Sequence, residues 1–99
     1  MSIYLRITSA LKESRKYYDK LTINQLLALL AVASEEGLNQ VKVSQAVGID
    51  QQQIANVIRT LELNQLIKRI KSPYGGNENN IYLSDKGIDL MTEIERIFL

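Results

Sequence analysis

The segment "GIDQQQIANVIRTLE", residues 48–62, brings three glutamines, an asparagine and an arginine together on one short stretch. Its apolar residues recur at i, i+3, i+4 and i+7, so they share one helix face and leave the polar side chains elsewhere on the surface. Glutamine and asparagine pair bidentately with adenine N6 and N7, and arginine reaches a guanine or a phosphate. This chemistry predicts contact with double-stranded DNA. The alternative is a solvated helix start, because glutamine is also a good helix former.

The chain of 99 residues contains no cysteine and no histidine. Disulfides and thiolate metal sites are therefore excluded, and so are the commonest general base and the commonest zinc ligand. Carboxylates do recur at Asp85, Asp89 and Glu93, but this i, i+4 spacing is more typical of a solvated helix stripe than of an acid/base pair. We expect no enzyme activity, no metal and no cofactor.

Charge is unevenly distributed along the chain, although the net charge is only +1. Residues 37–72 carry five basic and two acidic side chains, whereas residues 73–99 carry two basic and five acidic ones. The basic surplus is modest, but it coincides with the glutamine segment, as an electrostatic footprint on DNA requires. Lys68, Arg69 and Lys71 alternate on a predicted strand, where phosphate contact and protection of a strand edge are equal alternatives.

Neither a targeting segment nor a membrane span is predicted. The amino terminus has Arg6 and lacks the 7 to 15 apolar residues of a signal-peptide core. The longest apolar run, residues 26–33, is far shorter than the roughly 20 residues that span a bilayer. We therefore expect a cytoplasmic protein with a buried core helix and no membrane association.

Helical spacing predicts a first amphipathic helix over residues 2–18 and a second over residues 23–36. Thr22 and Gln25 form a capping-box pattern at the start of the second helix. Gly37 is expected to end it, because glycine tolerates the left-handed conformation.

Two shorter helices follow. Asn39 is the predicted cap of a helix over residues 40–47, which Gly48 ends, and Asp50 is the predicted cap of a helix over residues 51–64. Two short helices joined through a Gly-Ile-Asp turn form a helix-turn-helix pattern, in which the second helix is the candidate reader.

After Asn64 the period of the apolar residues changes to two, which is typical of a strand. "LIKRIK" and "NIYLS" alternate apolar and polar residues, and "SPYGGNENN" joins them, so two antiparallel strands are expected before a last helix from about Asp85. The predicted fold class is mainly α with a small β-wing, a winged helix-turn-helix in the order α-α-α-α-β-β-α. We expect a single domain over residues 1–99, with terminal helices over 1–20 and 85–99, a helix-turn-helix over 39–64 and a wing over 66–84.

The run "LTINQLLALL", the segment "GLNQVKVSQAVGIDQQQIANVIRTLELNQLIKR" and the turn "IYLSDKG" together resemble the MarR-type winged helix regulators. The family's pattern has a Leu-Thr opening, a Leu-Glu pair closing the reading helix, a hydrophobic-Ile-x-Arg strand and a Leu-Thr/Ser-x-x-Gly turn. The resemblance covers roughly residues 21–90. The order and spacing of these motifs together carry the resemblance.

The resemblance implies a dimeric DNA-binding transcription regulator, a repressor that binds an inverted-repeat operator with one reading helix in each major groove. The expected DNA-binding residues are Lys42, Gln51, Gln52, Gln53, Ala55, Asn56, Arg59, Thr60, Lys71, Tyr74 and Asn77. The expected dimerisation residues lie on the two terminal helices: Ile3, Ile7, Leu11, Met91, Ile94 and Phe98. For the last helix the alternative is packing of its apolar stripe against its own domain.

The wing departs from the family's pattern. Members usually carry an Asp-x-Arg motif there, whereas this wing reads "YGGNENN" and has no basic residue beyond Lys71. A second hypothesis is therefore a protein-interaction module that keeps the winged helix scaffold without binding DNA. No sequence signature indicates a small-molecule effector.

Overall fold

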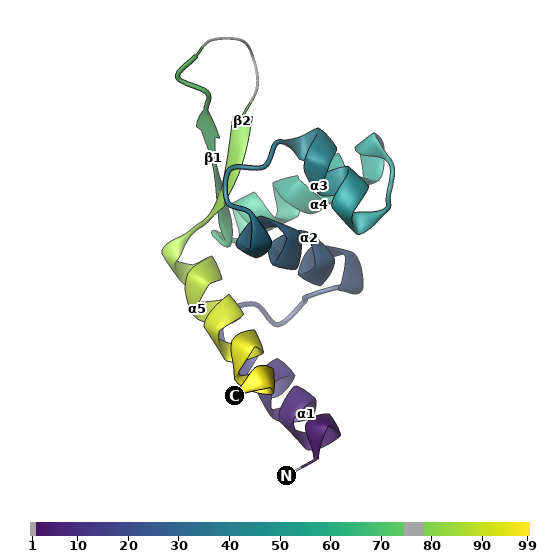
Figure 1. The fold of residues 1–99 in the computed structure, drawn as a ribbon, viewed down its shortest axis with the longest axis vertical. Helices are drawn as coiled ribbons and strands as arrows, with labels where there is room; N and C mark the ends of the chain where they lie inside the picture. The colour runs from purple at the N-terminus through teal and green to yellow at the C-terminus, as the bar shows by residue number, and fades with distance from the viewer. Residues whose placement is uncertain (1, 75–78) are drawn as a thin grey trace.

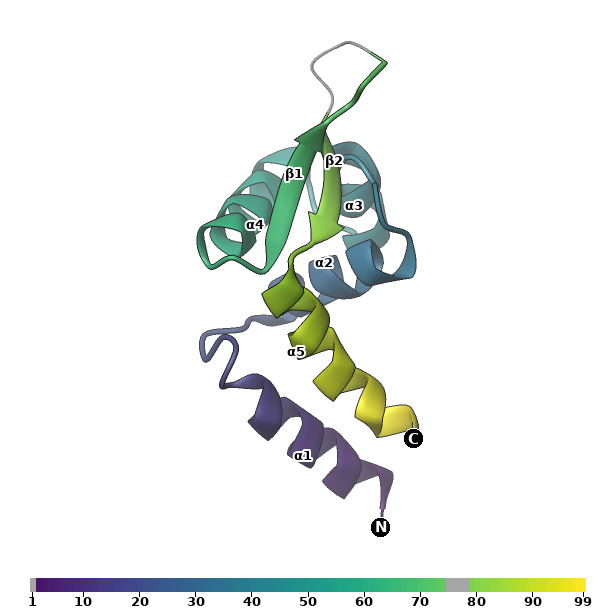
Figure 2. The same ribbon diagram turned by 90° about the vertical axis from the view of Figure 1, so that its left-hand side faces the viewer.

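The computed structural model describes residues 2–74 and 79–99 and forms an elongated molecule of 49 × 25 × 21 Å (Figure 1). The elements run in the order α1 (Ile3–Ser14), α2 (Ile23–Ser34), α3 (Gln40–Val47), α4 (Gln51–Leu63), β1 (Ile67–Lys71), β2 (Asn79–Leu83), α5 (Asp85–Glu95) and the 3-10 helix η1 (Arg96–Phe98). We call α2 to β2, residues 23–83, the body. We call α1, α5 and η1 the arm, because they extend away from the body (Figure 2).

Each α-helix begins at a polar side chain that accepts a hydrogen bond from the backbone N–H three residues later. These caps are Ser2, Thr22, Asn39, Asp50 and Ser84. A cap satisfies one of the free N–H groups in the first turn, so these residues determine where the helices start. The predicted caps Thr22, Asn39 and Asp50 are confirmed.

Two helices end earlier than the sequence predicted. The α1 helix stops at Ser14, because Arg15, Lys16 and Tyr17 donate to carbonyls only three residues back and tighten the last turn. The tyrosines after it then pack against the core.

The α2 helix stops at Ser34 instead of residue 36. The next residues form hydrogen bonds to β2. The Glu36 carboxylate accepts from the Leu83 N–H at 3.1 Å, and the Gly37 N–H donates to the Ile81 carbonyl at 2.9 Å. Gly37, with φ of 93°, adopts the expected left-handed conformation, but it lies two residues beyond the C-cap Glu35 and so does not end the helix as predicted.

The wing is a two-stranded antiparallel sheet whose register runs from Ile67 opposite Leu83 to Lys71 opposite Asn79. Leu38 forms an isolated antiparallel bridge to Ile81, which pairs with Arg69 of β1 on its other side, so the edge of β2 away from β1 is paired at this residue. The predicted winged helix-turn-helix order, mainly helical with a small β-wing, is confirmed.

The core lies where α2, α4 and the sheet meet α5. Its fully buried side chains include Leu29, Ile54, Ile58, Leu61, Leu66, Ile81 and Leu90. The apolar stripe predicted on α4 is therefore the face that holds this helix on the body. None of the helices within the described ranges is long and apolar enough to cross a membrane.

Leu61 and Leu63 allow a matched test of this packing, because they lie on one helix and are 0% and 75% exposed. We expect Leu61→Ala to lower the free energy of unfolding by about 2–5 kcal/mol through lost burial and a residual cavity. Leu63→Ala should change it by less than about 0.5 kcal/mol. Urea unfolding of both variants measures the difference, and equal losses would contradict the described orientation of α4.

Candidate nucleic-acid interface

The turn between α3 and α4 holds the candidate reader in place. Gly48 has a φ of 82°, a left-handed conformation that favours glycine, and its N–H donates to the Ser44 carbonyl at 2.8 Å. Asp50 then caps α4 through the Gln53 N–H at 2.8 Å. With its apolar stripe buried, α4 leaves Gln52, Asn56 and Arg59 exposed to solvent.

The three glutamines have different roles. The Gln51 amide donates to the Ser44 hydroxyl at 2.8 Å, and that buried hydroxyl donates in turn to the Val41 carbonyl at 2.6 Å. The Gln53 carbonyl accepts from the Asp50 N–H at 3.4 Å, which completes a capping box. Among the described residues none bonds to the Gln52 side chain. Gln51 and Gln53 therefore support the helix-turn-helix, and Gln52 keeps its whole amide for an external partner.

Asn56 and Arg59 lie one turn apart and interact. The Arg59 guanidinium donates to the Asn56 side-chain carbonyl at 3.3 Å. This contact leaves the Asn56 NH₂ group and most of the guanidinium donors free. The two exposed side chains thus form one donor-rich patch next to Gln52. The predicted residues Ala55 and Thr60 are half-buried beside it.

The basic side chains around α4 are unequally available. Lys42, Lys68 and Lys71 are exposed. Arg69, in contrast, donates to both carboxylate oxygens of Glu62, at 2.7 and 3.1 Å. This hydrogen bonding lowers the pKa of Glu62 and raises that of Arg69, so both remain charged and pair with each other. Arg69 therefore contributes less to the positive surface than the sequence count suggests.

The wing extends from the body on the side opposite the chain termini (Figure 1). Tyr74, near its tip, is 95% exposed, and Lys71 is exposed at the end of β1. Asn77 lies outside the described residues. Within those residues, no group of three or more acidic, histidine or cysteine side chains is arranged to hold a metal ion.

The predicted dimerisation residues divide into two groups. Ile3, Leu11 and Phe98 are exposed and Ile7 is half-buried, whereas Met91 and Ile94 are 5% and 6% exposed because they pack against the core of their own chain. Met91 therefore packs against its own domain, which was the alternative to dimerisation, and it has little surface left for a partner.

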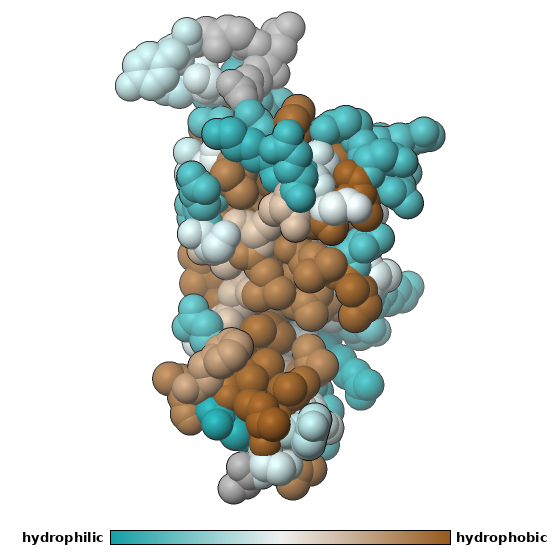
Figure 3. All heavy atoms as spheres, turned by 45° about the vertical axis from the view of Figure 1, so that its right-hand side comes forward, coloured by the Kyte–Doolittle hydropathy of each residue, from teal (hydrophilic) through white to brown (hydrophobic). Residues whose placement is uncertain are grey.

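An apolar groove of about 330 Å³ lies between the arm and α2. It is lined by Ile3, Ile7, Leu11, Leu26, Leu30, Ile94, Ile97 and Phe98. Figure 3 shows apolar side chains gathered over the lower and middle parts of this face. The sequence did not indicate the contribution of α2, because the exposed side of this helix is as apolar as its buried side.

Two features of the site escaped sequence reasoning: the Gln51–Ser44 bond and the pairing of Arg69 with Glu62. The partners in each pair are seven residues apart and lie on different elements. Helical or strand periodicity carries no signal for such pairs.

The fold and the polar outer face of α4 define a winged helix-turn-helix protein. The chain belongs to the MarR family, since the model of that family matches residues 21–74, more than half of the chain. Members of this family are DNA-binding transcription regulators, a class distinct from enzymes. Among curated proteins no sequence matches the chain.

Several solved structures resemble this one. The PcaV transcriptional regulator from Streptomyces coelicolor, in complex with its natural ligand, is 29% identical with a TM-score of 0.69 over 80% of this chain and 59% of that one. RV1404 from Mycobacterium tuberculosis is 18% identical with a TM-score of 0.81, over 96% and 66% of the two chains. The MepR–DNA complex of S. aureus is 24% identical with a TM-score of 0.80, over 97% and 78%. This chain thus spans about three fifths of the PcaV chain.

The different roles of neighbouring glutamines can be tested by two alanine variants. Gln51→Ala should lower the free energy of unfolding by about 0.5–1.5 kcal/mol, because it removes a bond to a buried hydroxyl. Gln52→Ala should change it by less than about 0.5 kcal/mol, because this side chain is solvated. Urea unfolding measures both values, and a larger loss for Gln52→Ala would reverse the assignment.

Proposed function

We propose that residues 1–99 act as one unit, a sequence-specific DNA-binding transcription regulator that represses by occupying an inverted-repeat operator as a homodimer. The observation that carries this proposal is the outer face of α4, where Gln52, Asn56 and Arg59 are exposed together. A helix held by its apolar face and bare on its polar face is what insertion into a major groove requires.

Each side chain has a role in this complex. Gln52 and Asn56 read adenine edges, and Arg59 reads a guanine or binds a phosphate. The Ala55 methyl group faces a thymine methyl, and the Thr60 hydroxyl makes a further polar contact. Gln53 is exposed, and its NH₂ group donates to the DNA while its side-chain carbonyl completes the capping box of α4. Lys42, exposed on α3, binds the phosphate backbone, which determines the register of the reader without specifying sequence. Lys71 and Tyr74 bring the wing against the adjacent backbone.

The exposed apolar side chains of the arm are the basis for the proposed dimer. Ile3, Leu11 and Phe98 are exposed and line the apolar groove beside α2, and an exposed apolar patch of this kind marks a protein–protein contact. A two-fold pairing covers it and places two α4 helices about one turn of DNA apart, or a multiple of it. The similar MepR chain is in a complex with DNA, which supports the same role here.

We expect Arg59→Ala to weaken operator binding more than about tenfold, because a bidentate base contact contributes about 1–3 kcal/mol of discrimination. The fold should be unaffected, since the side chain is exposed and bonds only to its neighbour Asn56 among the described residues. Fluorescence anisotropy with a labelled operator measures the affinity. Lys20→Ala, which removes an equal charge from the loop between α1 and α2, is the matched control. Equal effects of the two variants would exclude α4 as the reader.

Selection of bound sequences from random duplex DNA, repeated over a salt series, tests the whole proposal. We expect enrichment of an inverted repeat. Binding should also fall steeply as the salt concentration rises, because several phosphate contacts release counterions. Weak binding without enrichment would support a protein-interaction module instead. The absence of a basic residue in the wing sequence beyond Lys71 and the pairing of Arg69 with Glu62 are the observations that favour this second function.

A further inference from the structure

The end of the reading helix α4 and the start of α5 are joined by hydrogen bonds through three consecutive carbonyls. The Asn64 carbonyl accepts from the Lys86 ammonium at 3.2 Å, and the Leu66 carbonyl accepts from the Ser84 N–H at 3.1 Å. Between them, the Gln65 carbonyl accepts from the Ser84 hydroxyl. We call residues 64–66 and 84–87 the joint.

These carbonyls would otherwise face water, since the last turn of a helix and the residues after it lack intrahelical partners. Gln65 has a φ of 62°, a left-handed conformation that takes the chain out of α4 and toward β1. Strain of this kind in a residue other than glycine persists only where neighbouring contacts hold it. At the end of α4 itself, the Gln65 N–H donates to the Glu62 carbonyl at 3.0 Å and the Leu66 N–H donates to the Leu61 carbonyl at 2.9 Å. The bonds from α5 hold the same segment from outside, so the end of the reading helix is tied to the first turn of α5.

The joint uses the particular chemistry of its residues. The Ser84 hydroxyl donates to the Gln65 carbonyl and also accepts from the Gly87 N–H at 3.0 Å as the cap of α5. Only a hydroxyl can do both at this size. A Cβ on Gly87 would collide with the Leu66 carbonyl oxygen, although Gly87 is in an ordinary helical conformation. The glycine is thus required by the close approach of two backbones.

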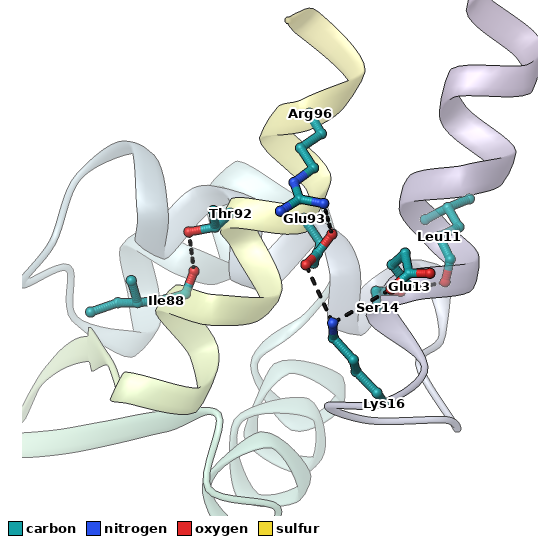
Figure 4. A network of polar contacts seen from close by, with 8 residues as sticks. All are labelled: Leu11, Glu13, Ser14, Lys16, Ile88, Thr92, Glu93 and Arg96. Carbon is teal, nitrogen blue, oxygen red and sulfur yellow. Dashed lines mark hydrogen bonds and ion pairs between the residues drawn. The ribbon is translucent and has the colours of Figure 1, made fainter.

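The arm beyond the joint is also tied together. Glu93 of α5 is buried, and its carboxylate pairs with Arg96 at 3.3 Å and with Lys16, just beyond α1, at 3.6 Å. Figure 4 shows the carboxylate lying between these two cations. Nearer the chain ends, the Arg6 guanidinium donates to the Leu99 carbonyl at 2.8 Å. The two terminal helices therefore move as one piece.

We propose that Ser84, Lys86 and Gly87 are positioning residues, which hold the arm at one angle to α4 and thereby determine the half-site spacing that the dimer accepts. This inference rests on the proposed function for its DNA-binding consequence. Residues 85–98 span on the order of 20 Å at about 1.5 Å per residue. A rotation of about 10° at the joint moves the far end by roughly 3.5 Å, comparable to the rise of about 3.4 Å per base pair. Small changes at the joint are therefore enough to shift the preferred spacing.

The joint can first be tested without DNA. The chain has no cysteine, so spin labels can be placed at Gln45→Cys on α3 and Glu95→Cys on the arm, both exposed positions. Pulsed electron paramagnetic resonance, with labelled chains diluted in unlabelled protein, gives the distance distribution within one chain. We expect a narrow distribution in the parent and a broadened or shifted one in Ser84→Ala. Thr22→Ala removes the equivalent cap from α2 and should leave the distribution narrow.

The second measurement uses the selected operator with its half-sites moved apart or together by one base pair. The parent and Thr22→Ala should lose more than about tenfold in affinity, an effect similar to that of a mismatched base pair. Ser84→Ala should lose less than about threefold or prefer a different spacing, while its affinity for a single half-site is unchanged. Lys86→Met, which keeps the apolar stem, should show the same change to a smaller extent and replaces Ser84→Ala if that variant does not fold.

The outcomes separate the two proposals. Narrow distances and undiminished spacing discrimination in both joint variants would overturn the role of the joint. Failure of the parent to bind any duplex would overturn the proposed function, while the distance distributions would still report on the joint.

Discussion

The α4 helix has to bury one face and leave the other bare, and the rest of the structure depends on that division. Ile54, Ile58 and Leu61 are fully buried under α2 and the sheet, which holds the helix firmly without using its polar side. Because a well-packed core tolerates little rearrangement, the exposed side chains project from a fixed axis. Reading a groove requires that rigidity, since bidentate contacts fail when a side chain is displaced.

Hydrogen bonds at both ends of α4 fix its position along the helix axis, in addition to the packing that fixes its rotation about that axis. At its start, Asp50 caps α4 and the Gln51–Ser44 bond fixes it to α3, and at its end the joint fixes it to α5. Both ends of a helix carry unsatisfied backbone groups, so each end attracts a partner. In this molecule the partners come from α3 at the start of α4 and from α5 at its end. The same bonds that stabilise the helix therefore also orient it.

The arm combines an apolar surface with charges that face inward. The side of α2 that does not contact the core continues the surface of α1 and η1, and the groove between them has an entirely apolar lining. Glu93, within the arm, lies between two cations that remain partly exposed. Removing one partner of a buried pair is costly, so this arrangement holds α1 to α5. The arm is thus a preformed unit that can meet a second copy as a single surface.

The sequence by itself determined the order of elements, the caps at Thr22, Asn39 and Asp50, and the inner and outer faces of α4. These follow from local rules, because hydrophobic period and capping act over a few residues. Tertiary structure alone decided that Gln51 supports α3, that Arg69 is engaged by Glu62, that Met91 belongs to the core, and that Gly87 meets the Leu66 backbone. Each of these joins residues on different elements. Packing determines the distance between such residues, and the spacing of residue types along the chain carries no information about that packing.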